Sequence, residues 1–345
     1  MEIKKVNIFY PIFIFGFIFL NLFVALFERS LILHGFTSGF PIWLLYVQNE
    51  VIILFMVLVY CLIFKVGLKD LRIKLISFKT VVFSLIIGYL IVPMALFITN
   101  IMTLFVENGA STTVSLVSPY SYGVQILLIA VMPAIVEEIS FRGIFYGTYR
   151  KSQKFFHAML LSAVLFGLFH LNFDQFVYAT FMGFLFARLT EATGSIVSSM
   201  CAHFAFNTFS VTTNYLAIKS GILEEAENVS TTESASHMIY TYIVLFVLGV
   251  ICVWLAIKMM DNLRNTKDIQ AKADKNIENN INNNYNACVD SNAANVENVS
   301  ADGNDILTNA VNLAAEPIEQ KRLITLPLVV GMLFCIIYMV LTIFM

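Results

Sequence analysis

The chain has 345 residues, of which 59% are hydrophobic and only 13% are charged, and its mean hydropathy is +0.80. This composition is too apolar for a soluble globular protein of that length, so the chain is predicted to be a membrane protein without a soluble catalytic domain. The formal net charge of −2 and the lack of a basic aromatic patch predict no nucleic-acid partner.

Apolar runs of roughly 20 residues, the length that crosses a hydrocarbon core of about 30 Å, recur along nearly the whole sequence. The first run follows Lys4 and Lys5, but its length and the lack of a small-residue cleavage site predict a retained helix and not a signal peptide. The predicted fold class is all-α, a polytopic transmembrane helical bundle of about eight to nine transmembrane helices. In chain order the runs cover residues 6–27, 43–64, 81–105, 122–147, 157–172, 174–190, 193–216, 238–260 and 323–345.

Lysine and arginine gather in alternate loops between these runs. They are dense at residues 65–79 and 150–154 and on both sides of the last loop. Residues 107–122 contain neither, and residues 220–237 carry several glutamates. The positive-inside rule then predicts a cytoplasmic N-terminus and an external C-terminus. Frequent isoleucine, lysine, asparagine and phenylalanine suit an AT-rich genome, so the expected location is a bacterial cell membrane.

The five cysteines are spread along the chain without a CxxC pair. Neither a disulfide framework nor a zinc-thiolate site is predicted, and no cofactor is expected. Four cysteines lie inside apolar runs and the fifth in a polar segment: Cys61, Cys201, Cys252, Cys335 and Cys288.

One segment, about residues 261–320, is polar and rich in asparagine and has few aromatic residues with which to build a core. This composition predicts a flexible cytoplasmic loop, with a regulatory or partner-binding tail as the alternative. The sequence shows no convincing internal repeat, so it does not support a transporter built from inverted halves.

Ionisable side chains near the bilayer centre are costly unless they face a cavity or a partner, so they are candidates for function. Two such residues, Glu137 and Glu138, are adjacent in the middle of one span, which packing alone does not explain. Five residues within the predicted spans qualify as candidates: Glu137, Glu138, Arg142, His170 and His203.

Helical spacing separates the roles of the two acids. Glu138 and Arg142 are four residues apart on one helix face, so the arginine can neutralise this glutamate, whereas Glu137 points roughly 100° away. Pro133 cannot donate a backbone hydrogen bond and is expected to kink the helix just before the acids. The alternative is a buried ion pair of Glu138 and Arg142 that only fixes helix packing.

Two other pairs of residues have the same four-residue spacing. His170 follows Phe166, and Asn207 follows His203, so each pair shares one face of its helix. Alone, His170 would more often be a packed histidine, and His203 with Asn207 could form only interhelical hydrogen bonds. Their occurrence together with the two acids favours a functional site.

Four more polar residues stand in or beside the spans. Asn49 and Glu50 in the second span could line the same cavity or an edge of the bundle, and the sequence does not choose between them. Asp174 and Arg188 bracket the sixth span and are interpreted as interfacial flanks.

On these residues the sequence resembles the CAAX protease and bacteriocin-processing family, membrane peptidases related to the prenyl-protein endopeptidase that removes the last three residues of CAAX proteins. Three motifs of that family are intact and in order: Glu-Glu-x-x-x-Arg at 137–142, Phe-x-x-x-His at 166–170 and His-x-x-x-Asn at 203–207. The Thr-Gly-Ser-Ile turn at 193–196 is also similar. The resemblance covers roughly residues 120–216.

The resemblance implies a metal-independent intramembrane endopeptidase that uses a glutamate-activated water and forms no covalent acyl-enzyme. Glu137 is expected to act as the general base, and His170 to hold and orient the water. His203 and Asn207 can each donate a hydrogen bond to the oxyanion of the tetrahedral intermediate. The second acid and its arginine would hold the first acid in position.

The expected partners are the lipid bilayer and a substrate that is a membrane-associated peptide or a lipidated protein tail. Prenylated CAAX tails and bacteriocin or pheromone leaders both stay open, although the AT-rich composition favours peptide processing.

Two alternatives compete with this hypothesis. In a zinc-dependent membrane peptidase, two histidines and a glutamate would bind the metal, but the chain lacks His-Glu-x-x-His, Asn207 is a poor zinc ligand, and no metal is expected. A non-enzymatic immunity scaffold or a proton-coupled transporter is also possible, because intramembrane glutamate and histidine suit proton relays.

The predicted depths of the site residues disagree. Glu137 and His203 fall near the middle of their spans, whereas His170 falls near the outer end of a short fifth span. Taken literally, this would separate His170 from the others by about 10 Å. A shifted or broken fifth helix is the expected explanation.

Five segments are predicted in all. They are N-terminal transmembrane helices (1–118), a catalytic transmembrane core (119–217), an external loop with a transmembrane helix (218–260), the asparagine-rich loop (261–322) and a C-terminal transmembrane helix (323–345).

Overall fold

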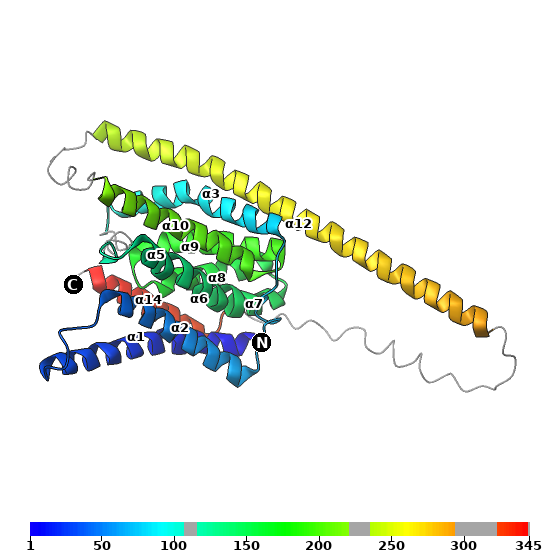
Figure 1. Ribbon diagram of the computed structural model, residues 1–345, viewed down its shortest axis with the longest axis horizontal. Helices are drawn as coiled ribbons and strands as arrows, with labels where there is room; N and C mark the ends of the chain where they lie inside the picture. Colours follow the sequence, from blue (N-terminus) through cyan, green and yellow to red (C-terminus); the bar gives the residue numbers. More distant parts are fainter. Residues whose placement is uncertain (107–115, 221–234, 294–322, 344–345) are drawn as a thin grey trace. The chain divides into compact units, whose positions relative to one another are not determined.

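The computed structural model describes residues 1–106, 116–220, 235–293 and 323–343 (Figure 1). Within these ranges the chain is helical and contains no strand, which confirms the predicted all-α class. Each predicted apolar run overlaps a helical segment. The segments are α1 (Ile3–Leu33), α2 (Ile42–Phe64), α3 (Phe78–Met102), the composite helix Tyr122–Ser152, α8 (Phe155–Phe169), α9 (Phe173–Thr193), α10 (Ile196–Lys219), α12 (Ala235–Ala293) and α14 (Leu326–Ile343).

Several of the described helices are long and apolar enough to cross a membrane. They are α1, α2, α3, the composite helix and Met238–Ile269 of α12, while α8 and α14 are shorter apolar helices. Large apolar side chains point outward, and Phe19, Leu22 and Phe23 of α1 are each more than half exposed. Such side chains suit a lipid environment. The chain is therefore an integral membrane protein.

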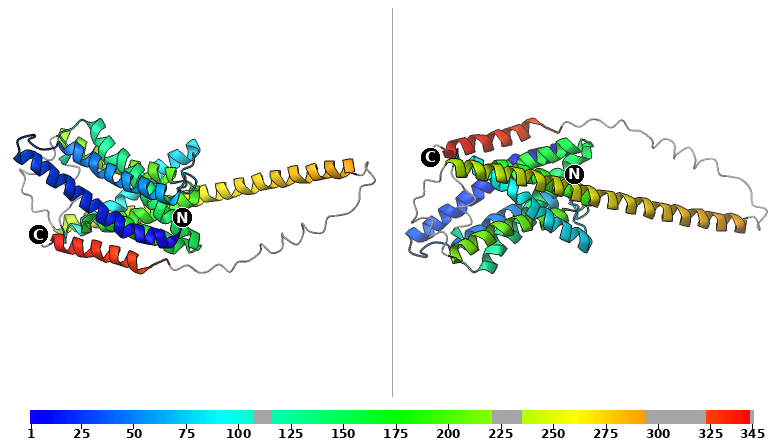
Figure 2. Two further views of the ribbon diagram at one scale, coloured as in Figure 1. Left: turned by 90° about the horizontal axis from the view of Figure 1, so that it is seen from below. Right: turned by 90° about the horizontal axis from the view of Figure 1, so that it is seen from above.

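The first and last helices lie side by side although they are far apart in the sequence (Figure 2). The Asn7 side-chain amide of α1 donates to the Leu323 carbonyl at 2.9 Å and to the Thr325 hydroxyl at 3.0 Å, just before α14 begins. The start of α1 and the end of α14 lie at opposite ends of the helix bundle (Figure 1). A cytoplasmic N-terminus and an external C-terminus would place these two helix ends on opposite sides of the membrane, as observed for the bundle. Which end of the bundle faces the cytoplasm stays a prediction.

The chain divides into two compact units, one made of Met1–Leu263 with Leu323–Met345 and the other of Arg264–Arg322. In the second unit, α12 continues as a helix to Ala293, whereas a loop is predicted from residue 261. The difference has a local cause, because residues 250–302 contain neither glycine nor proline, the two residues that most disfavour the interior of a helix. Low hydrophobicity argues against a packed core but does not forbid a helix. The rest of the predicted loop lies outside the described residues.

Two glycines allow α8 and α9 to approach each other closely. A Cβ atom added at Gly167 of α8 would lie 2.6 Å from the Phe176 carbonyl oxygen of α9. A Cβ atom at Gly183 of α9 would lie 3.1 Å from the Ala163 Cα atom of α8. Small residues at a helix interface are a common device in membrane proteins. The close packing holds His170, at the end of α8, against the core.

We expect Gly167→Ala to lower the free energy of unfolding by about 1–3 kcal/mol, because the new methyl group overpacks against a backbone carbonyl. The measurement is thermal unfolding of the purified protein in one detergent. Gly123→Ala is the matched control, because a Cβ atom there meets nothing within 4 Å. Equal midpoints for the two variants would contradict this account of the interface.

A cluster of charged residues joins four parts of the chain at the end of the bundle where α1 begins. Glu191 of α9 accepts hydrogen bonds from Arg72 at 3.1 Å, from Arg150 at 2.8 Å and 2.9 Å, and from the Tyr146 hydroxyl at 2.7 Å. The Ser195 hydroxyl, before α10, donates to the Lys74 carbonyl at 2.6 Å. These bonds set the relative depth of the composite helix, α9 and α10.

Candidate active site

The composite helix changes its winding around the two acids. In order it consists of α5 (Tyr122–Gln125), the π-helix η1 (Ile126–Val131), α6 (Met132–Glu138), the π-helix η2 (Ile139–Tyr146), α7 (Gly147–Tyr149) and the 3₁₀ turn η3 (Arg150–Ser152). Glu137 and Glu138 therefore end a short α-helical segment between two π-helical ones. Short π-helical segments are rare and often occur at functional sites.

Pro133 explains one contact of Asn207. In a regular α-helix the Ile129 carbonyl would accept from the N–H of residue 133, but proline has none. The Asn207 side-chain amide of α10 donates to this carbonyl at 3.0 Å. One hydrogen of the Asn207 side-chain NH₂ group is thus bonded to the backbone of the composite helix. The same group has a second hydrogen that can be donated to another acceptor.

Replacing Asn207 with alanine is expected to cost about 1 kcal/mol of unfolding free energy, because the Ile129 carbonyl loses its side-chain donor. In a Pro133→Ala background the cost should shrink, since the N–H at position 133 is restored. A four-variant stability cycle in detergent measures this coupling. Additive effects of the two substitutions would show that the contact does not compensate for the proline.

The second acid, Glu138, is neutralised as predicted. Its Oε1 atom lies 2.9 Å from Arg142 Nη1, and both side chains are fully buried. Among the described residues no nitrogen of this guanidinium has a hydrogen-bond partner of good geometry. The guanidinium carbon instead lies 4.3 Å from the centre of the Phe166 ring and 5.3 Å from that of Phe186, so aromatic faces also stabilise the charge.

His203 lies between the two acids. Its Nδ1 atom is 3.1 Å from Glu138 Oε1, and its Nε2 atom is 3.8 Å from Glu137 Oε2. A glutamate that faces an arginine is ionised and can only accept, so Nδ1 is the protonated nitrogen and donates to Glu138. In the neutral imidazole, Nε2 then carries a lone pair and faces Glu137.

His170 is the C-terminal cap of α8, and its Nδ1 atom lies 2.9 Å from the Phe166 carbonyl oxygen. Because a carbonyl only accepts, Nδ1 carries the proton and Nε2 is left with a lone pair. The predicted mismatch in depth disappears. The composite helix extends to Ser152, and α8 begins at Phe155, so Glu137 and His170 each lie fifteen residues from the same turn. Helix α8 starts two residues earlier than expected and is not broken.

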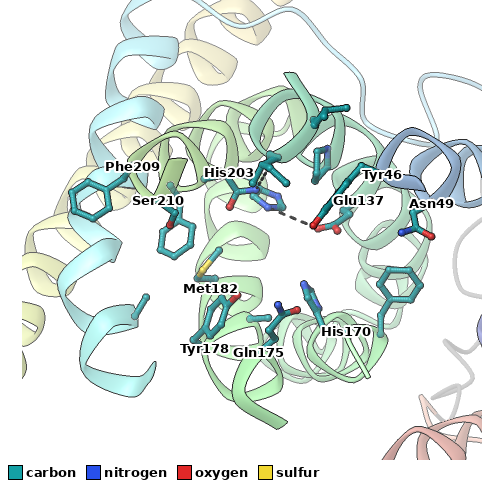
Figure 3. Close-up of a pocket in the computed structure, with 18 of the residues that line it drawn as sticks. Tyr46, Asn49, Glu137, His170, Gln175, Tyr178, Met182, His203, Phe209 and Ser210 are labelled. Atoms are coloured by element: carbon teal, nitrogen blue, oxygen red, sulfur yellow. Dashed lines mark hydrogen bonds and ion pairs between the residues drawn. The ribbon is translucent and has the colours of Figure 1, made fainter. Parts of the chain in front are cut away.

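These groups meet at a cavity of about 1020 Å³ between α2, α3, the composite helix, α8, α9 and α10. Glu137, His170, His203 and Asn207 line it, and Figure 3 shows the first three around one space. The cavity extends to Ile42 at the start of α2 and to residues near the end of α10. Glu138 and Arg142 do not line it and lie behind the other site residues.

Other residues of the cavity wall were undecided or missed at the sequence level. Asn49 and Glu50 of α2 both line the cavity, which resolves the choice that the sequence left open. Gln175 and Tyr178 of α9 also line it, and no motif pointed to them. Asp174, which is interpreted from the sequence as an interfacial flank, is fully buried within the protein.

The part of the chain that the structure describes contains no group of three or more histidine, cysteine, aspartate or glutamate side chains placed to hold a metal ion. The two imidazole rings at the cavity are oriented through their Nδ1 atoms. His203 bonds to the Glu138 carboxylate, and His170 bonds to a backbone carbonyl.

The comparisons with known proteins concern the same part of the chain. Residues 119–209 match the family model described as type II CAAX prenyl endopeptidase Rce1-like. A Bacillus subtilis protein named "Putative membrane peptidase YdiL" is 38% identical over 87 residues, which is 25% of this chain and 36% of that protein. The alignment thus spans about a third of the relative's length. No solved structure matches. Residues 119–209, which contain the three motifs, are therefore similar to the type II CAAX prenyl endopeptidase family.

Proposed function

We propose that the protein is a metal-independent intramembrane endopeptidase that cleaves membrane-associated peptides or lipidated protein tails with a glutamate-activated water. The observation that carries the proposal is the position of Glu137. This acid faces a membrane-embedded cavity beside His203 and opposite His170, while Arg142 is committed to the neighbouring Glu138. A free carboxylate and an imidazole lone pair at one cavity are the groups that water activation needs.

In the proposed reaction a water binds between Glu137 and Nε2 of His170. Glu137 takes a proton from the water as the water oxygen attacks the carbonyl carbon of the scissile bond. The carbonyl oxygen becomes the oxyanion of a tetrahedral intermediate. The proton then passes from Glu137, by way of His203, to the leaving nitrogen as the carbon–nitrogen bond breaks, which leaves a carboxylic acid and a free amine and restores Glu137.

The oxyanion role expected for His203 requires a further condition. In the neutral tautomer that Glu138 favours, Nε2 has no hydrogen to donate. His203 can donate from Nε2 only as an imidazolium, a form that two adjacent carboxylates stabilise. We therefore assign His203 a positive charge during the reaction, with Glu137 as the source of the proton. The second N–H of Asn207 is the other candidate donor.

The test uses the purified protein in detergent or liposomes with a panel of hydrophobic peptides, and mass spectrometry of the products. Cleavage by the wild type that is lost in Glu137→Gln and survives exhaustive chelation is the expected result. Cleavage that stops on chelation and returns with zinc would favour a zinc peptidase. Peptide binding without cleavage in either protein would favour the non-enzymatic scaffold.

A further inference from the structure

Glu50 of α2 is a buried acid that the proposed reaction does not use. Its side chain lines the same cavity as Glu137, and the residue is only 8% exposed. Its Oε2 atom has no hydrogen-bond partner among the described residues. Helix α2 lies outside the segment 119–209 that matches the family, so Glu50 is a feature of the N-terminal helices of this chain.

No positively charged side chain on the described cavity wall neutralises the carboxyl group of Glu50. None of the described residues that line the cavity is lysine or arginine. The nearest buried cation of the site, Arg142, is paired with Glu138. Glu50 and Glu137 line the same cavity, so their like charges would repel each other if both were ionised. An empty cavity therefore contains two carboxyl groups and no fixed cation to neutralise them.

A buried carboxylate without a partner is costly, and a cation that enters the cavity relieves that cost. Asn49, beside Glu50 on the cavity wall, adds a side-chain oxygen that can accept from an ammonium or guanidinium group. A ligand that ends in a carboxylate gains no such stabilisation, because the cavity wall that it meets has no lysine or arginine among the described residues.

We propose that Glu50 is a specificity-determining residue that receives the lysine or arginine side chain of a substrate peptide in the cavity. This inference rests on the proposed peptidase function and names its substrate class. The preferred substrates are membrane peptides that carry a basic residue near the cleaved bond. Tails whose carboxylate terminus must lie in the cavity are disfavoured.

The experiment uses hydrophobic peptides that are identical except for one position, which is scanned on both sides of the cleaved bond and carries lysine, norleucine or glutamate. The wild type should cleave the best lysine peptide with a kcat/KM about tenfold or more above its norleucine counterpart. In Glu50→Gln this ratio should fall to about one, and Glu50→Lys should prefer glutamate. Glu50→Asp should keep the preference for lysine, and Glu2→Gln, at an exposed position, should leave the ratio unchanged.

Because the readout is a ratio within one protein sample, partial misfolding does not change it. A Glu50→Gln variant that keeps the lysine preference, or a wild type without one, overturns the proposal. Binding keeps the two proposals distinguishable. A fluorescent lysine peptide should bind Glu137→Gln more tightly than the Glu50→Gln/Glu137→Gln double variant. If the wild type cleaves none of the peptides and this difference in binding is still found, the peptidase function is refuted and the cation site stands, whereas equal binding refutes the cation site.

Discussion

Replacing Glu137 with glutamine is expected to lower kcat by about 10²- to 10⁴-fold, the range that a general base contributes. Glutamine has the size of glutamate but cannot take a proton from water. Peptide binding should stay nearly unchanged, because the cavity keeps its shape. The measurement is steady-state kinetics together with binding of a labelled peptide to the same preparations.

Two variants provide controls for this prediction. Glu137→Asp keeps a carboxylate that is one methylene shorter, so we expect activity between those of the wild type and Glu137→Gln. Glu2→Gln makes the same chemical change at an exposed position and should keep full activity. A Glu137→Gln enzyme that turns over at the wild-type rate would show that another group activates the water.

The second large effect concerns stability. Arg142→Met should lower the free energy of unfolding by about 3–5 kcal/mol, because it leaves Glu138 as an uncompensated charge at a fully buried position. Methionine keeps contact with Phe166 and Phe186 but removes the positive charge that lies against their rings. Unfolding in a titration from mild detergent into a denaturing one provides the measurement.

The double variant Glu138→Gln/Arg142→Met separates charge from packing. Without the buried acid, the loss of the arginine should cost much less, so the double variant should be more stable than Arg142→Met alone. It should still be poorly active, because His203 loses the carboxylate that orients its Nδ1 atom. Equal instability of the single and double variants would mean that the arginine acts mainly by filling space.

The sequence alone was sufficient for the membrane class, for the helical segments and for the residues of the three motifs. Hydropathy is a local property of about 20 residues, and the bilayer converts it directly into a helix. The pairing of Glu138 with Arg142 was equally predictable, because a four-residue spacing lies within one helix. The extension of α12 past residue 260 was not predicted. A polar composition indicates that a segment does not build a packed core, but it does not indicate whether that segment is helical.

The relations between helices were decided only by the tertiary structure. No local pattern could show that His203 lies near both acids or that Glu50 faces the cavity. Nor could it show that Asn207 donates to the Ile129 carbonyl, one turn before Pro133. Each depends on the depth and rotation of one helix against another. Those are set by long-range contacts such as the hydrogen bonds of Glu191 and the close packing at Gly167. The sequence by itself determined which polar groups enter the membrane, and the packing of the helices decided which of them meet, because side-chain chemistry is local and helix register is not.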